Sequence, residues 1–598
     1  MAQTPNDPIN TSRRAAIASG AALLGSTIFA NMPANGQSGT APASTPPAAA
    51  AAMPAGYNIL FVLVDQEHFF DKWPFPVPGR EAIKKAGTSF LNHQAAACVC
   101  SAARSVIYTG QHIQHTGVAD NPPNVWQKDL PPTIATIGHR LTELGYHASY
   151  QGKWHMSVNL DQTPNPIDAP IKEYRKIIES YGFKDFFGVG DLIDGTQGGY
   201  AYDDTTLAAT LTWLRKDAQE LRKKAQPWYL AVNLVNPHDT MYFNSDLADE
   251  SVQGRQHAFA IARAPEDDIY RARWDVPLPV SRNQPLDQPG RPRAHRIYQA
   301  VTNLQVGTWP DEDRRWRALQ DYYFNAIRDC DRKVEALLEA LNGNGMAGNT
   351  IVIFTADHGE LGGHHQLRNK GATVYRQQNH VPLMIVHPAF AGGKQCEAMT
   401  SQLDLVPTII GLTGVEEKAR KSAAAGLKGR DFSVILRNPE TAPINAIRPA
   451  TLFNFDMLSF QDARWASMTI DTKPFKGLNR AGQIAELNKH PPDFHNRMSI
   501  RSIFDGRYRF ARYFAPVAFN TPESMEQLFA MNDIEIYDHR NDPAEMDNLA
   551  LDPKRNGELI AALNQETNRR IGEEVGIDDG RFLPIRGGKW HFPPADER

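Results

Sequence analysis

Cysteine is scarce in this sequence, with four residues among 598. This scarcity excludes a disulfide scaffold as the basis of the fold. Cys98 and Cys100 lie too close together to bridge easily, and the sequence leaves open whether Cys330 pairs with Cys396. An excess of charge is missing as well, because 63 Lys and Arg residues nearly balance 67 Asp and Glu residues. This balance gives no indication of nucleic-acid binding, and we expect no nucleic-acid partner.

Long apolar runs are also absent, and no stretch has the length and composition of a membrane span. The most apolar N-terminal stretch, residues 15–30, follows Arg13 and Arg14 and is rich in small residues. A charged start, an apolar centre and small residues near the end are typical of an export signal, and paired arginines indicate the twin-arginine route. We therefore expect a bacterial signal peptide over residues 1–37, recognised by the Tat export machinery, and a periplasmic or secreted protein. A short N-terminal membrane anchor is the alternative.

Residues 38–55 are rich in Ala, Pro, Ser and Thr and contain few large apolar side chains. Such a segment cannot bury enough surface to pack, so we expect a disordered linker.

Ordered structure is expected from about residue 56, where continuous apolar runs alternate with helical patterns. A run without polar alternation is typical of a parallel strand buried on both faces. Helical spacing of apolar residues predicts a helix over 323–341, and a second helix is expected over 133–144. The expected strands are residues 58–64, 228–234, 350–355 and 383–386.

Alternating strands and helices predict an α/β fold with a large, mostly parallel or mixed sheet between helices. We expect this catalytic domain over residues 56–440. The remainder, residues 441–598, predicts a smaller C-terminal α+β subdomain with a short antiparallel sheet. Its signals are a hairpin over 502–510, with Asp505 and Gly506 at the turn, a strand over 534–537 and a helix over 557–570.

Three of the expected strands end on polar residues that can bind metal. The run 58–64 is followed by Asp65 and Gln66, and the run 350–355 leads to Asp357 and His358. The run 228–234 leads to His238. Ligands of open α/β sheets gather outside the carboxyl ends of the strands, so this pattern predicts an enzyme with its site at that edge.

Short motifs in a fixed order then carry a resemblance to a known family. Cys100 is followed four residues later by Arg104 as the chain enters a segment with helical character. The chain resembles the type I, formylglycine-dependent sulfatases of the alkaline phosphatase superfamily from about residue 57 to residue 550. The landmarks are Asn58 to Gln66, Cys100 to Arg104, Gly152-Lys153-Trp154-His155, Asn236-Pro237-His238, Thr355 to Glu360, Lys370-Gly371 and the closing segment Ile536 to Ala550.

The resemblance implies an alkaline phosphatase-like fold and one divalent cation. Its implied ligands are Asp65, Gln66, Asp357, His358 and the group derived from Cys100. Carboxylate and amide oxygens suit calcium. The family's first pair is often two aspartates, and asparagine is frequent where His358 stands. Fewer acidic ligands and one imidazole make Mn²⁺ the alternative to Ca²⁺.

The resemblance further implies that Cys100 is oxidised to formylglycine, whose hydrated aldehyde attacks the sulfur of a sulfate ester. A formylglycine-generating enzyme is then a transient partner. Arg104 would steady the diol, one helical turn away. Ala102 stands where the family usually has proline. Cys98 cannot take the role of Cys100, because the residue four places beyond it is Ala102.

Four further side chains are assigned by the same resemblance. Lys153 and Lys370 resemble the lysines that contact sulfate oxygens, and His155 resembles the base that deprotonates the diol. His238 resembles the general acid that protonates the leaving group. The expected activity is therefore that of a sulfuric ester hydrolase acting on a small-molecule or saccharide sulfate ester.

Two other functions remain open from the sequence. A phosphonate monoester or phosphodiester hydrolase of the same superfamily shares the nucleophile and the metal residues. A non-catalytic periplasmic binding protein with a degenerate pocket is the third reading, supported only by Ala102. Carbohydrate, aryl, alkyl and choline sulfates all remain candidate substrates.

Overall fold

The computed structural model describes residues 53–122, 124–157, 171–188, 196–255, 257–470 and 477–592. The predicted signal peptide with its paired arginines, and the predicted linker up to residue 52, lie outside these residues. Within the described part of the chain, every helix is too short or too polar to cross a membrane.

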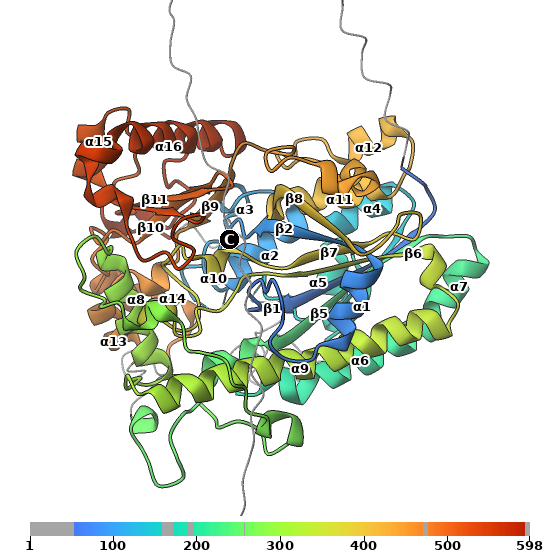
Figure 1. Ribbon diagram of the computed structural model, residues 1–598, viewed down its shortest axis with the longest axis horizontal. Helices are drawn as coiled ribbons and strands as arrows, with labels where there is room; N and C mark the ends of the chain where they lie inside the picture. The colour runs from blue at the N-terminus through green and yellow to red at the C-terminus, as the bar shows by residue number, and fades with distance from the viewer. Residues whose placement is uncertain are drawn as a thin grey trace, which may run out of the picture. The chain divides into compact units, whose positions relative to one another are not determined.

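A large sheet of eight strands forms the centre of the fold, in the order β4-β3-β5-β1-β6-β7-β2-β8 (Figure 1). Only β7 runs against its neighbours β6 and β2, and the other pairings are parallel. The predicted mostly parallel or mixed sheet is confirmed. The strands are β1 (Asn58–Asp65), β2 (Thr88–Gln94), β3 (His147–Gly152), β4 (Lys184–Phe187), β5 (Trp228–Pro237), β6 (Thr350–Ala356), β7 (Leu383–Val386) and β8 (Lys394–Ser401).

The central strand β1 shows why a continuous apolar run was the right signal. All eight of its residues are buried. Successive side chains of a strand point to opposite faces, and Ile59 and Phe61 join one apolar cluster whereas Leu60 and Val62 join another. Both faces are therefore covered, and each fully buried side chain of this size contributes about 1.5–3 kcal/mol.

Helices supply these two covers. One face of the sheet packs against α1 (Pro78–Ala86), α6 (Gly198–Arg215) and α9 (Asp313–Gly343). The other face packs against α2 (Cys100–Thr109), α4, α5 and α11 (Figure 1). The bounds of the last three are α4 (Ile137–Glu143), α5 (Ile171–Glu179) and α11 (Leu405–Leu412). The other helices of this part of the chain are α3 (Ile113–Thr116), α7 (Asp217–Lys223), α8 (Arg293–Val306), α10 (Arg376–Asn379) and α12 (Glu417–Ala423).

The two predicted helices of this region are both present, with different ends. The helix expected over 323–341 is the second half of α9, which begins ten residues earlier. The helix expected over 133–144 is the shorter α4. Thr136 caps it, because its hydroxyl accepts a hydrogen bond of 3.1 Å from the N–H of Gly138, and a cap of this kind fixes where a helix starts.

A second sheet of four antiparallel strands, ordered β12-β11-β10-β9, lies in the C-terminal part of the chain. The predicted hairpin is confirmed: Asp505 Oδ1 accepts the N–H groups of Arg507 and Tyr508 at 2.8 and 2.6 Å, and Gly506 has φ of 94°. The division of the chain near residue 440 stays a prediction. The elements are β9 (Thr451–Phe455), β10 (Ser499–Phe504), β11 (Tyr508–Phe514), β12 (Asp533–Asp538), α13 (Ala463–Ile470), α14 (Arg480–Lys489), α15 (Met525–Met531), α16 (Pro553–Glu574) and a final ribbon of β13 (Ile585–Arg586) and β14 (Lys589–Trp590).

Candidate active site

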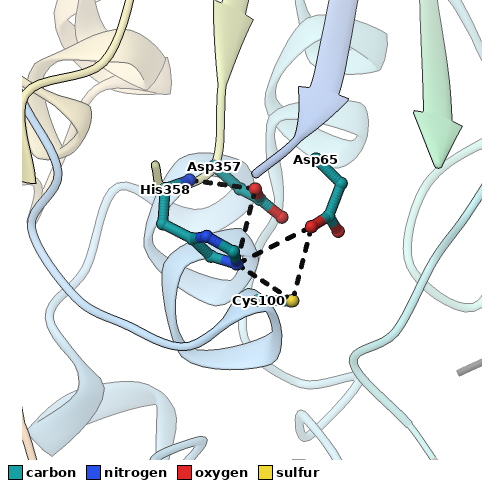
Figure 2. A group of neighbouring side chains, drawn as sticks. All are labelled: Asp65, Cys100, Asp357 and His358. Carbon is teal, nitrogen blue, oxygen red and sulfur yellow. Dashed lines mark hydrogen bonds and ion pairs between the residues drawn. The ribbon is translucent and has the colours of Figure 1, made fainter. Parts of the chain in front are cut away.

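Four side chains with metal-binding atoms meet at the carboxyl edge of the large sheet. Asp65, Cys100, Asp357 and His358 each offer one ligand atom, these atoms lie within 4.8 Å of one another, and all four residues are buried. Figure 2 shows the two carboxylates, the imidazole and the thiol turned toward a common point. Four of the five predicted metal-site residues are thus brought together.

The register of the sheet explains why two distant segments meet here. Strands β1 and β6 are parallel neighbours, with Val64 opposite Ala356. The residues that follow, Asp65 and Asp357, therefore leave the sheet side by side. Cys100 is the first residue of α2, so its side chain and the free N–H groups of that helix end face the same space.

The contacts around the thiol define the geometry. Cys100 Sγ lies 3.0 Å from Nε2 of His358 and 3.6 Å from Oδ1 of Asp65. The other ring nitrogen, Nδ1 of His358, lies 3.0 Å from the carbonyl oxygen of Gly359. A carbonyl only accepts hydrogen bonds, so Nδ1 carries the proton and Nε2 is the atom available to a metal.

Two cations hold the outer oxygens of the aspartates. Arg104 donates through Nη2 to Oδ2 of Asp65 at 3.1 Å and through Nε to Oδ2 of Asp357 at 3.0 Å. Lys153 Nζ lies 2.8 Å from the same oxygen of Asp65. Burial alone would raise the pKa of Asp65, but the charges of Lys153 and Arg104 hold the pKa well below its usual range. Oδ1 of Asp65 faces the thiol of Cys100, and Oδ1 of Asp357 accepts the backbone N–H groups of Gln66 and His358 at 3.1 and 2.9 Å.

The donor set fits a divalent cation. Two carboxyl groups, one imidazole nitrogen and the group at position 100 bring the lone pairs that such an ion needs to one buried point. Gln66, the fifth predicted ligand, is placed beside this set. Its amide donates from Nε2 to Glu360 and accepts at Oε1 from Nζ of Lys370.

A cavity of about 150 Å³ opens above the cluster. Cys100, His155, His238 and Lys370 line it together. His155 follows Gly152 and Lys153, and Gly152 has φ of 88°, with its Cα so near β5 that an added Cβ would lie 2.0 Å from a carbonyl oxygen. A glycine is therefore required where β3 turns toward the site.

Burial favours the neutral form of both cavity histidines. Burial, followed by the neighbouring lysines, lowers the pKa of His155 and of His238 well below the usual value. A neutral imidazole in this position can accept a proton or donate one N–H, which matches the base role predicted for His155. For His238 it means that the N–H group, and not an imidazolium, is the resting donor.

Residues that the sequence analysis missed hold these groups in place. Asp203 of α6 accepts the N–H groups of Val235 and Asn236 at 2.8 and 2.9 Å, just before His238. Asn233 Oδ1 accepts a hydrogen bond of 3.2 Å from Nη1 of Arg104. Asn233 could have been identified from the sequence, because it is a polar residue inside the apolar run 228–234.

An α/β sheet with a buried acidic cluster and flanking cations at its carboxyl edge defines an enzyme built for an anionic ester. The sequence profile of the sulfatase family matches residues 58–415, and the chain therefore belongs to the sulfatase family. It is a sulfatase, a hydrolase of sulfate esters.

Two relatives illustrate the distance to characterised proteins. Arylsulfatase K of Danio rerio is 23% identical over 422 residues, which cover 69% of this chain and 74% of that protein. Choline-sulfatase of Rhizobium meliloti strain 1021 is 27% identical over 382 residues, which cover 60% of this chain and 68% of that protein.

Solved structures share the fold. A 2-O GAG sulfatase has a TM-score of 0.59 at 18% identity, with 90% of this chain and 99% of that chain covered. A phosphonate monoester hydrolase from Silicibacter pomeroyi has a TM-score of 0.57 at 17% identity, with 87% and 96% covered. The fold is thus common to both kinds of hydrolase.

Proposed function

We propose that this sulfatase uses a formylglycine, formed by oxidation of Cys100, as the nucleophile that attacks the sulfur of its ester. The observation that carries the proposal is the position of Cys100 Sγ, which shares one buried cluster with Asp65, Asp357 and His358. In the hydrated aldehyde, Cβ of residue 100 would carry two hydroxyls in place of the thiol.

We propose Ca²⁺ as the resident cation, with Mn²⁺ as the alternative. Asp65, Asp357, His358 and the group at position 100 would hold it, and Gln66 lies beside them. When bound, the cation supplies positive charge that favours the ionised form of the nucleophile and offsets the charge of the sulfate oxygens.

The remaining steps use His155, His238 and Lys370 of the cavity and Lys153, which pairs with Asp65. His155 accepts the proton of the attacking hydroxyl. Lys153 and Lys370 balance the negative charge of the sulfate oxygens in the transition state, and the N–H of His238 donates to the leaving oxygen. The second hydroxyl of the diol then loses its proton, which expels sulfate and restores the aldehyde without attack of water on sulfur.

The contacts of Arg104 favour a narrower role than direct contact with the diol. Among the described residues, the guanidinium of Arg104 donates hydrogen bonds to Asp65, Asp357, Asn233 and the carbonyl of Lys153. We therefore assign Arg104 as the residue that orients the two carboxylates.

A phosphonate monoester or phosphodiester hydrolase activity is the second candidate, because the fold is shared with a phosphonate monoester hydrolase. A direct comparison of 4-nitrophenyl sulfate with 4-nitrophenyl phenylphosphonate tests which of the two activities the enzyme prefers. The proposal expects the higher kcat/KM for the sulfate. Turnover of the phosphonate with an inert sulfate would reverse the assignment.

Modification of Cys100 is proposed to precede folding. The cysteine is only 2% exposed and every residue of α2 is buried, so a formylglycine-generating enzyme needs the unfolded segment. The twin-arginine route carries folded proteins, which fits oxidation in the cytoplasm followed by export to the periplasm. Replacement of Arg13 and Arg14 by lysine is expected to retain active enzyme in the cytoplasm, and undiminished export would contradict the route.

A further inference from the structure

The catalytic cavity has few charged walls. Among its described lining residues Lys370 is the only Lys, Arg, Asp or Glu, and Asn121, Asn124, Gln305 and Ser459 are polar but uncharged. A sulfate group therefore has a cationic partner in Lys370, but the organic part of the ester has none. The apolar wall residues are Val99, Met241, Tyr242, Phe259, Met457 and Phe460.

A second chamber of about 330 Å³ lies next to this cavity. The two spaces share four wall residues, Asn124, Phe259, Gln305 and Ser459. The second chamber is therefore the neighbouring space for a ligand that is anchored at Cys100 and is longer than the first cavity. The apolar wall of the second chamber consists of Val125, Trp126, Ala258, Val301, Trp465, Ala466 and Leu487.

Aromatic rings give this chamber its shape. The rings of Trp126 and Trp465 meet edge to face, with centroids 5.2 Å apart and planes at 60°. Trp126 also stacks on Trp590 at 5.8 Å. The indoles are thereby fixed before a ligand arrives, and a fixed aromatic wall favours flat apolar groups because little ordering is needed on binding.

Two polar residues at the junction, Asn124 and Ser459, are engaged with Asp120 and with each other. Asn124 Nδ2 donates to Oδ1 of Asp120 and to Oγ of Ser459, both at 2.9 Å. Ser459 Oγ donates in turn to Asp120 at 2.8 Å. These groups are committed, whereas a sugar ring needs donors and acceptors that turn outward.

The charge of the lining residues distinguishes an aryl sulfate from a polysulfated saccharide as the ligand of the second chamber. None of the described residues that line the second chamber is Asp, Glu, Lys or Arg. A polysulfated saccharide would place further anions against these residues without cationic partners, and those anions would lose water without compensation.

We propose that the second chamber is the binding subsite for the distal ring of an aryl sulfate with more than one aromatic ring. This inference rests on the proposed function, because the sulfate of the same ligand must lie at position 100. The ester oxygen and first ring occupy the catalytic cavity, and the next ring passes Phe259 to reach Trp126 and Trp465.

The first arm of the test is kinetic and uses the full-length, Ca²⁺-loaded enzyme. Phenyl sulfate and 4-biphenylyl sulfate have leaving groups of similar acidity, so a difference in kcat/KM reports binding of the second ring. We expect at least a 10-fold preference for the biphenylyl ester, and lower kcat/KM for choline sulfate and N-acetylglucosamine 6-sulfate. Equal rates for the two aryl esters, or a preference for the saccharide, would overturn the assignment.

The second arm blocks the chamber. Thr469 lines it from α13, whereas Ser467 of the same helix is exposed. Thr469→Phe is expected to lower kcat/KM for the biphenylyl ester at least 10-fold and to leave phenyl sulfate within 2-fold. Ser467→Phe adds the same bulk outside the chamber and is expected to change neither. A loss that is equal for both esters in Thr469→Phe would contradict the subsite.

The third arm measures binding without turnover. Calorimetry with Cys100→Ala should show tighter binding of 4-biphenylyl sulfate than of phenyl sulfate, and Thr469→Phe in that background should remove the difference. If no sulfate ester is hydrolysed but this binding difference is present, the proposed function fails and the subsite stands. If phenyl sulfate is hydrolysed and the binding difference is absent, the subsite fails and the proposed function stands.

Discussion

Nε2 of His358 lies 3.0 Å from Sγ of Cys100, and this contact distinguishes the thiol of Cys100 from that of the nearby Cys98. Cys98 is fully buried in an apolar cluster with Val99 and Tyr298, and burial raises its pKa well above the usual value. A thiol in that setting is an inert core residue. The two cysteines thus have different environments, although one residue lies between them.

Loss of one carboxylate of the cluster should weaken metal binding. Asp357→Asn removes a negative charge from the set formed with Asp65 and His358, and we expect the Kd for Ca²⁺ to rise at least 100-fold, or about 2.7 kcal/mol. Calorimetric titration of the metal-depleted protein measures this. Asp204→Asn, at an aspartate whose side chain is 69% exposed, is the matched control. An unchanged Kd in Asp357→Asn would remove Asp357 from the site.

Loss of Arg104 should destabilise the metal-depleted protein. Arg104→Met keeps the length of the side chain but leaves Asp65 and Asp357 without their shared cation, which is expected to lower the free energy of unfolding by about 3–5 kcal/mol. Urea unfolding measures the change. Added Ca²⁺ should recover more stability in this variant than in the wild type, because the ion then supplies the missing charge.

The exposed Arg215 provides the control for that experiment. Arg215→Met is expected to change the free energy of unfolding by less than about 0.5 kcal/mol. If both variants had the same small effect, the bridge between the two carboxylates would contribute nothing to stability.

Acid stability should depend on His93. Burial lowers the pKa of His93 to about 3, below the value of about 6.5 in an unfolded chain. Between these values the unfolded state binds the extra proton, so the contribution to stability is complete above pH 6.5 and is lost as the pH falls. Each pH unit in this window costs about 1.4 kcal/mol.

His93→Gln should therefore flatten the profile. Gln can still reach Oγ1 of Thr400, which lies 2.8 Å from Nδ1 of His93, but it does not titrate. Urea unfolding between pH 4.5 and 6 is expected to show a slope smaller than that of the wild type by about 1.4 kcal/mol per pH unit. His495→Gln, at a histidine whose side chain is 81% exposed, should leave the slope unchanged. Parallel profiles for His93→Gln and wild type would refute the burial effect.

Asp203 is predicted to act on catalysis by positioning His238. In Asp203→Asn only one side-chain oxygen remains for the N–H groups of Val235 and Asn236, so the segment that leads to His238 should shift. We expect kcat to fall about 10- to 100-fold, with KM little changed. The loss should be larger for esters with poor leaving groups, because His238 donates to the leaving oxygen.

Asp204→Asn, at the next position of α6, is again the control. A loss in Asp203→Asn that is independent of the leaving group would indicate a structural role only, and unchanged kcat would exclude the positioning role.

Much of the fold could be predicted because buried parallel strands leave continuous apolar runs. Strands β1, β5 and β6 have this pattern. Strand β8 contains Lys394, Gln395 and Glu397, and β3 contains His147 and Gln151, so neither run was visible. The reversed direction of β7 could not be predicted either, since strand direction depends on the path of the connecting chain.

The site also has residues that could be predicted from the sequence and contacts that could not. Residues that end strands, such as Asp65 and Asp357, could be placed from sequence because the carboxyl ends of parallel strands share one edge. Supporting contacts could not: the hydrogen bond of Arg104 to Asn233 depends on the tertiary register of β5 against β1. Glu360 belongs to the motif from Thr355 to Glu360. Its hydrogen bonds to Gln66 and to the N–H of Asn369 depend on the folded loop and could not be predicted from the sequence.

The group formed from Cys100 is proposed to perform the attack on sulfur. Preparations that differ in the fraction of chains with an aldehyde at position 100 can be compared by mass spectrometry of that peptide and by the rate of sulfate release from phenyl sulfate. We expect a rate proportional to the aldehyde fraction and no turnover when the thiol is intact. Sulfate release by the pure thiol form, or a silent enzyme with the aldehyde and Ca²⁺ in place, would contradict it.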